Sequence, residues 1–279
     1  RLEHHEEAPS LKECLHLLAT NRPLLMLFLG NIFFVIIKVS EQASFYFAYD
    51  ALFNAKYNGF LDIAKAPGSF LAGIFVPIII ERLGRKADSK KFYQVCCVMG
   101  IVLNGLFALC TYNGIMNKGA GQSVSLLTGL MVIVFSAVVT FPLEFKNLMQ
   151  KEMEAETVDY VEWKTGKRVE GTMLSIMSFT GKLEGTLSSF ICLQVLARTG
   201  YVEHTTDVST LQNHSTLLGL FLMTTVFPMV GYALMLIPMH FYNITGDSHR
   251  RMIKDIMARR AQAGEAAAQE AVAAEAKEG

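Results

Sequence analysis

The chain has 279 residues, of which 52% are hydrophobic and 18% are charged, and its mean hydropathy is +0.33. Soluble domains of this size carry more charge and fewer long apolar runs, so we expect an all-α membrane protein. The formal net charge of zero argues against nucleic-acid binding through bulk electrostatics. We find no nucleophile–base pair, metal-ligand cluster or phosphate loop in the sequence, so we expect neither an enzyme nor a resident metal or cofactor.

Residues 1–22 precede the first apolar run and are expected to form a cytoplasmic linker. Four apolar residues follow helical spacing there and predict a short amphipathic surface helix: Leu11, Cys14, Leu15 and Leu18. The segment His4 to Glu7, HHEE, is interpreted as a solvated loop rather than a metal site, because two adjacent His point in different directions on a helix.

Six apolar segments are long enough to cross a bilayer core, which takes ~20 helical residues. They lie at about 23–52, 57–81, 92–112, 122–145, 171–197 and 215–242. The first contains Lys38 and Glu41, and we interpret it as one long, tilted or kinked span. The six spans predict a bundle over residues 23–245, followed by a cytoplasmic tail, 246–279, that is a solvated helix or partly disordered.

Basic residues alternate between the connecting segments. Their number runs three, one, five, one, five, one, five along the chain. The five that we assign to the connection between the fourth and fifth spans are Lys146, Lys151, Lys164, Lys167 and Arg168. By the positive-inside rule, this alternation predicts a multi-pass protein of the cell's inner (plasma) membrane with both termini in the cytoplasm.

The fifth span carries a narrow polar stripe around Lys182. This lysine lies ~16 Å into the span, near the bilayer midplane. On a helical wheel, five polar residues fall within ~80° of one another: Ser175, Ser178, Lys182, Thr186 and Ser189. Either the stripe lines a wet cavity, or the hydroxyls bond their own backbone while Lys182 snorkels. Its depth favours the cavity.

Two further features of the fifth span concern packing and charge. Gly181 and Gly185 have the four-residue spacing that lets two helices approach closely, so we interpret them as packing residues. Glu184 lies ~160° from Lys182 on the wheel, so the two cannot pair on one helix, and the sequence offers no account of Glu184.

The first span repeats the pattern of polar residues at membrane depth. If its helix is unbroken, Asn31, Lys38, Gln42 and Tyr49 fall within ~40° of one another. Glu41 is close enough to Lys38 to form an ion pair. Such a pair either merely tolerates burial or takes part in a solute pathway, and both interpretations remain open.

One charged segment and the span after it carry a resemblance to a known family. The run ETVDYVEWKTGKRVEG, continuing into SIMSFTGKLEG, resembles the signature of the glycoside–pentoside–hexuronide:cation symporters, the melibiose-carrier-like branch of the major facilitator superfamily. RLGRK at Arg82 to Lys86 and SFYFAYDAL near the end of the first span agree with it. The resemblance covers the C-terminal half of that fold, and so implies six helices forming one of its two bundles.

The resemblance also implies roles for particular residues. Lys182 matches a helix lysine that borders the cation and sugar sites, and Ser178 a polar position near the sugar. Glu156, Asp159 and Arg168 match charges that close the cytoplasmic side, and we include Glu162 of the same cluster in this inner gate. We place the gate in a cytoplasmic loop. Glu184 departs from the family, which usually has a small residue there.

The function that the resemblance implies is secondary symport by alternating access. The solute would be a glycoside, pentoside or hexuronide, and the coupling cation Na⁺ or H⁺. The N-terminal six-helix half would be the partner, in the same longer chain or as a separate subunit. Two alternatives remain open: a related facilitator for a non-sugar solute or lipid, and a non-transporting half that binds a partner.

Overall fold

The computed structural model describes residues 10–54, 56–83, 88–118, 121–166, 169–203 and 211–278. Within these ranges the regular structure is helical throughout. The helices in chain order are α1 (Leu11–Thr20), α2 (Arg22–Tyr46) with a π-helical extension (Phe47–Ala51), α3 (Lys56–Leu83), α4 (Ser89–Met116), α5 (Leu126–Thr165), α6 (Glu170–Thr199), α7 (His214–Phe241) and α8 (Gly246–Glu278). The segment His4 to Glu7 lies outside the described residues.

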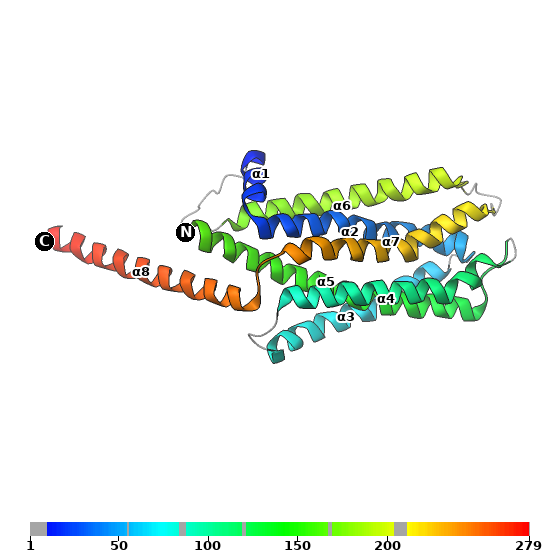
Figure 1. Ribbon diagram of the computed structural model, residues 1–279, viewed down its shortest axis with the longest axis horizontal. Coiled ribbons are helices and arrows are strands. Elements are labelled where there is room, and N and C mark those ends of the chain that lie inside the picture. The colour runs from blue at the N-terminus through cyan, green and yellow to red at the C-terminus, as the bar shows by residue number, and fades with distance from the viewer. Residues whose placement is uncertain are drawn as a thin grey trace.

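Six long helices, α2 to α7, run side by side in one bundle (Figure 1). Helix α2 packs against α6 and α7, and α5 packs against α3 and α4. Extensive packing between α4 and α7 joins these two groups. Helices α1 and α8 lie at the same end of the bundle, and α8 extends beyond it (Figure 1).

Local sequence signals explain where the helices begin and end. Ser10 and Glu13 form a reciprocal capping box at the start of α1, as predicted for a surface helix there. Asn213 caps α7 by accepting a hydrogen bond from the Thr216 backbone N–H at 2.7 Å. Gly166 and Gly200 end α5 and α6 with φ of 72° and 75°, a left-handed conformation that glycine adopts without steric cost.

Each predicted span coincides with a helix, but α5 differs in length. It ends at Thr165 rather than near residue 145, so most of DYVEWKTG is helix and the predicted loop is wrong. The buried positions Phe145, Met149, Met153 and Thr157 continue the four-residue spacing past the apolar run. The tail forms α8, which agrees with the solvated-helix alternative; its Ala and Glu are strong helix formers.

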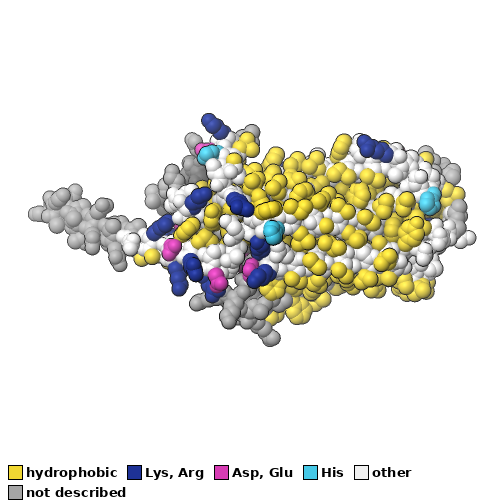
Figure 2. All heavy atoms as spheres, in the orientation of Figure 1, with side chains coloured by type: hydrophobic (Ala, Val, Ile, Leu, Met, Phe, Trp, Pro, Cys, Tyr) yellow, Lys and Arg dark blue, Asp and Glu magenta, His cyan; other side chains and the backbone are white. Residues whose placement is uncertain are grey.

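The outer surface of the bundle is apolar along most of its length. Leu109, Leu126 and Phe70 have 77%, 76% and 71% of their surface exposed. Figure 2 shows apolar side chains over most of one face, with charged side chains gathered toward the end that carries α8. A bilayer-facing surface requires this distribution.

Length and composition alone identify four membrane-crossing helices in the described part of the chain. These are α2 with its π-helical extension, α4, α5 and α7. Helices α3 and α6 are not among them; in α6, Lys182, Glu184 and several Ser and Thr lower the hydropathy. The multi-pass character is thus supported, whereas six crossings remain a prediction.

Candidate functional site: a polar pocket inside the bundle

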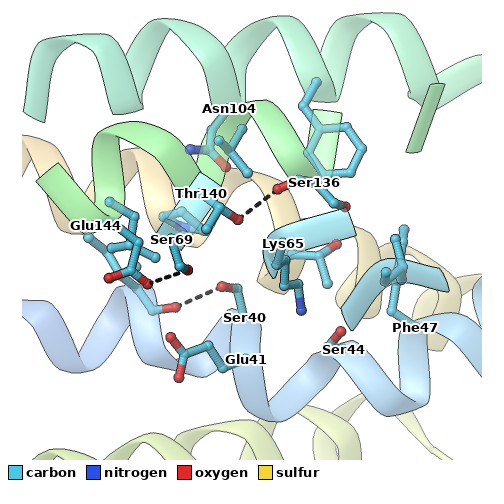
Figure 3. A pocket seen from close by; sticks show the side chains of 17 residues that line it. Ser40, Glu41, Ser44, Phe47, Lys65, Ser69, Asn104, Ser136, Thr140 and Glu144 are labelled. Carbon is cyan, nitrogen blue, oxygen red and sulfur yellow. Dashed lines mark hydrogen bonds between the residues drawn. The ribbon is translucent and has the colours of Figure 1, made fainter. Parts of the chain in front are cut away.

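Five helices line a pocket of about 340 Å³ whose walls are both polar and apolar, which we call the central pocket (Figure 3). Helices α2, α3, α4, α5 and α7 all contribute to its lining. The polar side chains around it are Ser40, Glu41, Ser44, Lys65, Ser69, Asn104, Ser136, Thr140, Glu144 and Thr224. Phe47 and Phe107 add apolar wall. A cavity with polar groups arriving from several helices is typical of a solute site in a helical bundle.

Two carboxylates dominate the charge of the central pocket. Glu41 projects from α2 and Glu144 from α5, on the same side of the cavity (Figure 3). Ser69 donates a hydrogen bond to Glu144 Oε1 at 3.3 Å. Lys65 also lines the pocket, and its ammonium lies 3.5 Å from Asp62 of the same helix. The pocket therefore offers acceptors for several hydroxyl groups.

The predicted ion pair between Lys38 and Glu41 is wrong. Lys38 instead pairs with Glu184 of α6, with its ammonium 3.2 Å from the carboxylate. Glu41 follows Lys38 by three residues and is rotated by 60° from it around the helix axis. Its side chain lines the central pocket, whereas that of Lys38 reaches α6. The side chain of Glu184 is only 9% exposed. The inter-helical pair thus accounts for the glutamate that the sequence left unexplained.

The polar stripe of α6 lies apart from the central pocket. Lys182, Ser175, Ser178 and Thr186 are all exposed on the side of α6 opposite its buried residues. Within the described ranges, Lys182 has no hydrogen-bond or ion-pair partner. The hydroxyls of Ser175 and Thr186 bond backbone carbonyls of their own helix at 2.9 and 3.1 Å. The structure therefore does not bring this stripe together with Glu41.

Gly181 and Gly185 share the open face of α6. A Cβ atom added at either would meet no described atom within 4 Å. Neither glycine therefore packs against another helix of the described chain, and their predicted packing role stays a prediction. The buried face of α6 uses other residues, among them Thr180, Glu184 and Ser188.

The other predicted polar residues of α2 also lie outside the central pocket. Gln42 and Tyr49 are exposed, and neither lines the cavity. The ring of Tyr49 stacks on Phe45, with centroids 4.7 Å apart. The π-helical extension that contains Tyr49 breaks the regular 100° spacing, on which the wheel prediction depended.

The predicted inner-gate carboxylates are paired within the described chain. Glu156 accepts a hydrogen bond from Ser89 Oγ at 2.8 Å. Asp159 lies 2.9 Å from His249 Nε2. Glu162 accepts from Arg260 Nε at 3.1 Å. Trp163 donates to Asp255 at 2.9 Å. The pairs Asp159–His249, Glu162–Arg260 and Trp163–Asp255 attach α8 to α5, and we call them the α5–α8 contact. Arg168 lies outside the described residues.

Sequence reasoning missed one buried charge altogether. Lys146 was assigned to a connecting loop, but it lies within α5 and is fully buried. Ser136, Thr140 and Glu144 of the central pocket were also missed, although their four-residue spacing marks one polar face of α5. Because the apolar run stops near 145, the sequence pattern concealed that the helix continues. Without Lys146, four basic residues still lie between the fourth and fifth predicted spans, so the alternation of basic residues along the chain remains.

A long-helix bundle with an apolar exterior and a polar interior cavity defines a class of protein, the multi-pass membrane transporters. The family described as MFS/sugar transport protein matches residues 2–246. The chain belongs to this family, which confirms the resemblance seen in the sequence; the family consists of transporters, not enzymes.

Curated relatives agree with this assignment. The chain is similar to the "Uncharacterized symporter YjmB" of Bacillus subtilis (25% identical; 90% of this chain and 50% of the relative). It is also similar to the "Putative 2,3-dihydroxypropane-1-sulfonate exporter" of Escherichia coli (27%; 91% and 50%) and to the "Glucuronide carrier protein homolog" of that organism (24%; 89% and 50%). The chain spans about half the length of these relatives.

Proposed function

We propose that the chain forms one wall of the solute passage of a cation-coupled sugar symporter that works by alternating access. The observation that carries the proposal is the central pocket. It places two carboxylates and several hydroxyl and amide groups inside a bundle whose exterior is apolar. Polar groups at membrane depth are costly, and they are retained where they line a solute or ion path.

The lining of the central pocket favours a polyhydroxylated solute. Glu41 and Glu144 accept hydrogen bonds from sugar hydroxyls, and Asn104 and Ser69 supply amide and hydroxyl groups. Phe47 and Phe107 pack against the apolar faces of a sugar ring. A glycoside, pentoside or hexuronide fits this chemistry. The glucuronide named for one relative and the sulfonate named for another are the first anionic candidates.

The exposed polar stripe of α6 provides the second part of the proposal. A lysine and three hydroxyl residues facing hydrocarbon would be unfavourable. We propose that the N-terminal six-helix half, in the same longer chain or as a separate subunit, covers this face. Lys182 and Ser178 then border the cation and the sugar, with Ser175 and Thr186 beside them. The open space at Gly181 and Gly185 gives that half room to approach.

The placement in the membrane follows from the same arrangement. We propose that α2 to α7 all cross the inner membrane, and that the end with α1 and α8 faces the cytoplasm, where charged side chains gather. Glu156, Asp159, Glu162 and Arg168 form the inner gate. Because the first three are paired within the chain, closing the gate requires them to exchange partners.

Uptake into membrane vesicles tests the proposal. Vesicles that contain this chain together with its N-terminal half are given one radiolabelled solute under a Na⁺ or a proton gradient. The solutes are a methyl glucuronide, and isoprimeverose and sulfoquinovose, which are named for two further relatives. Glu41→Gln removes one carboxylate from the central pocket, and Lys182→Ala removes the exposed ammonium; we expect both to abolish accumulation. Lys12→Ala, on the exposed face of α1, serves as the matched surface control.

Each outcome separates the proposal from its alternatives. Accumulation of none of the three solutes, with accumulation of another solute or lipid in a wider screen, would favour the non-sugar facilitator. No accumulation of any solute, with stable capture of a partner subunit, would favour the non-transporting half. Normal accumulation by Glu41→Gln would remove the central pocket from the pathway.

A further inference from the structure

A second pocket lies between α3 and α5, where both helices begin, at the end of the bundle away from α8 (Figure 1). Its volume is about 400 Å³, and we call it the α3–α5 groove. The described lining comes from the residues around the start of α3 and from the first turns of α5. The groove shares no lining residue with the central pocket, so the proposed solute passage does not use it.

The walls of the α3–α5 groove are apolar and open to the surroundings. Phe60 of α3 and Leu126 and Leu130 of α5 have 55%, 76% and 50% of their surface exposed. Tyr57 joins the two walls, because its hydroxyl lies where a Cβ atom added at Gly129 of α5 would stand. If the groove were empty, these side chains would lack contacts on one side. A membrane helix pair therefore favours an apolar occupant here.

The mouth of the groove presents hydrogen-bond donors and one positive charge. Lys56, the first residue of α3, is exposed, and within the described ranges its ammonium forms no ion pair. The side-chain oxygen of Asn54 accepts from the Lys56 backbone N–H at 3.1 Å. The amide of Asn54 then faces further ligands with its two N–H groups, which are donors. These groups complement an anion that accepts hydrogen bonds, as a phosphodiester does.

The charge and the apolar walls follow one another in depth as the parts of a phospholipid do. Lys56 lies at the edge of the second predicted span, at the level of lipid headgroups. Phe60 lies one turn deeper, ~6 Å at 1.5 Å per residue, and the α5 wall from Leu126 to Ile133 covers ~10 Å. A phosphate beside Lys56 thus places an acyl chain along both walls.

The size of the groove favours a single chain over a protein helix. One turn of a helix ~11 Å across fills roughly 500 Å³, which is more than the volume of the groove. The N-terminal half is proposed to cover α6, which contributes nothing to the described lining. That lining also contains no Asp or Glu. The ammonium of a zwitterionic headgroup would therefore find no carboxylate there, whereas a headgroup with a net negative charge needs none.

We propose that the α3–α5 groove binds an anionic phospholipid, with its phosphate at Lys56 and Asn54 and one acyl chain along Phe60, Leu126 and Leu130. The inference rests on the proposed crossing of the membrane by α3 and α5, and is independent of the solute carried. Both helices also line the central pocket. A lipid that fills the space between them therefore helps to hold that wall of the pocket in place.

Photolabelling tests the inference directly. The chain, purified in detergent together with its N-terminal half, receives phosphatidylglycerol that carries a photoreactive acyl chain, and the labelled peptides are mapped. The label is expected in residues 56–60 and 126–133. Phosphatidylcholine with the same acyl chain is expected to label these residues about fivefold less at equal concentration, because its headgroup has no net charge to attract the lysine.

Two substitutions of Lys56 separate its charge from its bulk. Lys56→Gln is expected to lower labelling by phosphatidylglycerol about fivefold, to the level of phosphatidylcholine. Lys56→Arg keeps the charge and is expected to restore the preference. Leu130→Trp fills the groove and is expected to lower labelling by both lipids. Arg198→Gln, at an exposed position in the last turn of α6 at the same end of the bundle (Figure 1), is the control and is expected to behave as native.

Three outcomes would overturn the inference. One is equal labelling by both lipids in the native protein and in Lys56→Gln. Another is a label that spreads along the exposed face of α3, including Phe70, without preference for the groove; this outcome leaves the proposed crossing of α3 intact. The third is a complete lack of label on α3, which counts against the proposed crossing as well. Failure of solute uptake, by contrast, counts against the proposed function and not against the lipid site.

Discussion

The interior of the bundle and the end that carries α8 both pair acids with bases, but in different surroundings. In the interior, Glu184 and Lys38 meet across two helices with side chains 9% and 27% exposed. In the α5–α8 contact, Asp159 and His249 meet with side chains 23% and 25% exposed, and Arg260 is 59% exposed where it meets Glu162. The difference in water access lies in one partner, because Arg260 is 59% exposed whereas Lys38 and His249 are 27% and 25% exposed.

Water access decides what each pair contributes. A buried charge that loses its partner keeps its desolvation cost, whereas an exposed charge is rehydrated. The interior pair is therefore expected to be sensitive to removal of one partner, and the α5–α8 contact to be tolerant. This difference suits an interior pair that holds two helices in register and the proposed gate at the end that carries α8.

The largest effect is expected from Lys38→Ala. It leaves Glu184, whose side chain is 9% exposed, in the interior without a cation, and we expect a loss of ~3 kcal/mol in the free energy of unfolding. Thermal unfolding of the detergent-purified protein measures it. In the double variant Lys38→Met with Glu184→Met, both charges are removed and most of this loss is expected to disappear. If the double variant is as unstable as the single one, the ion pair is not the cause.

The packed and open faces of two helices give the second test. A Cβ at Gly100 of α4 would lie 2.4 Å from the buried ring of Tyr232 on α7, so Gly100→Ala is expected to cost ~1–3 kcal/mol by overpacking. Gly181→Ala on the open face of α6 meets nothing in the described chain and gains helix propensity. Its stability is expected to be unchanged or slightly higher. An equal loss from both variants in thermal unfolding would contradict this arrangement.

The smallest effect is expected at the α5–α8 contact, and it depends on pH. The hydrogen bond to Asp159 raises the pKa of His249 above its usual value, with the nearby Glu156 charge adding to the effect and burial opposing it. A raised pKa in the folded state means that the contribution is complete below pH ~6.5 and is lost as the pH rises through the raised value. His249→Gln is therefore expected to cost ~0.5–1 kcal/mol in mild acid and nothing in alkali.

Hydrogen–deuterium exchange of residues 246–260 follows this loss directly. In the native protein, exchange in α8 is expected to become faster as the pH rises, after correction for the intrinsic rate. In His249→Gln it is expected to be fast at every pH. Equal protection of α8 in both proteins across the range would mean that His249 does not hold the helix.

The sequence alone determined the helical class, the positions of the long helices and the family. Apolar runs of ~20 residues have few alternatives to a membrane helix. Ser10 and Asn213 begin α1 and α7 through local hydrogen bonds, a signal in the sequence that the prediction did not use. The angular position of Lys182 opposite Glu184 was also predicted correctly, because it depends only on the 100° spacing within one helix.

Only the tertiary structure decided which polar groups meet. Glu184 pairs with Lys38 rather than remaining alone, and Glu41 faces a pocket instead of its neighbour. Lys146 proved to be an interior residue because α5 continues beyond its apolar run. These facts depend on how one helix is rotated and shifted against the next. Periodicity within a helix carries no information about that rotation, since many inter-helical arrangements bury the same apolar face.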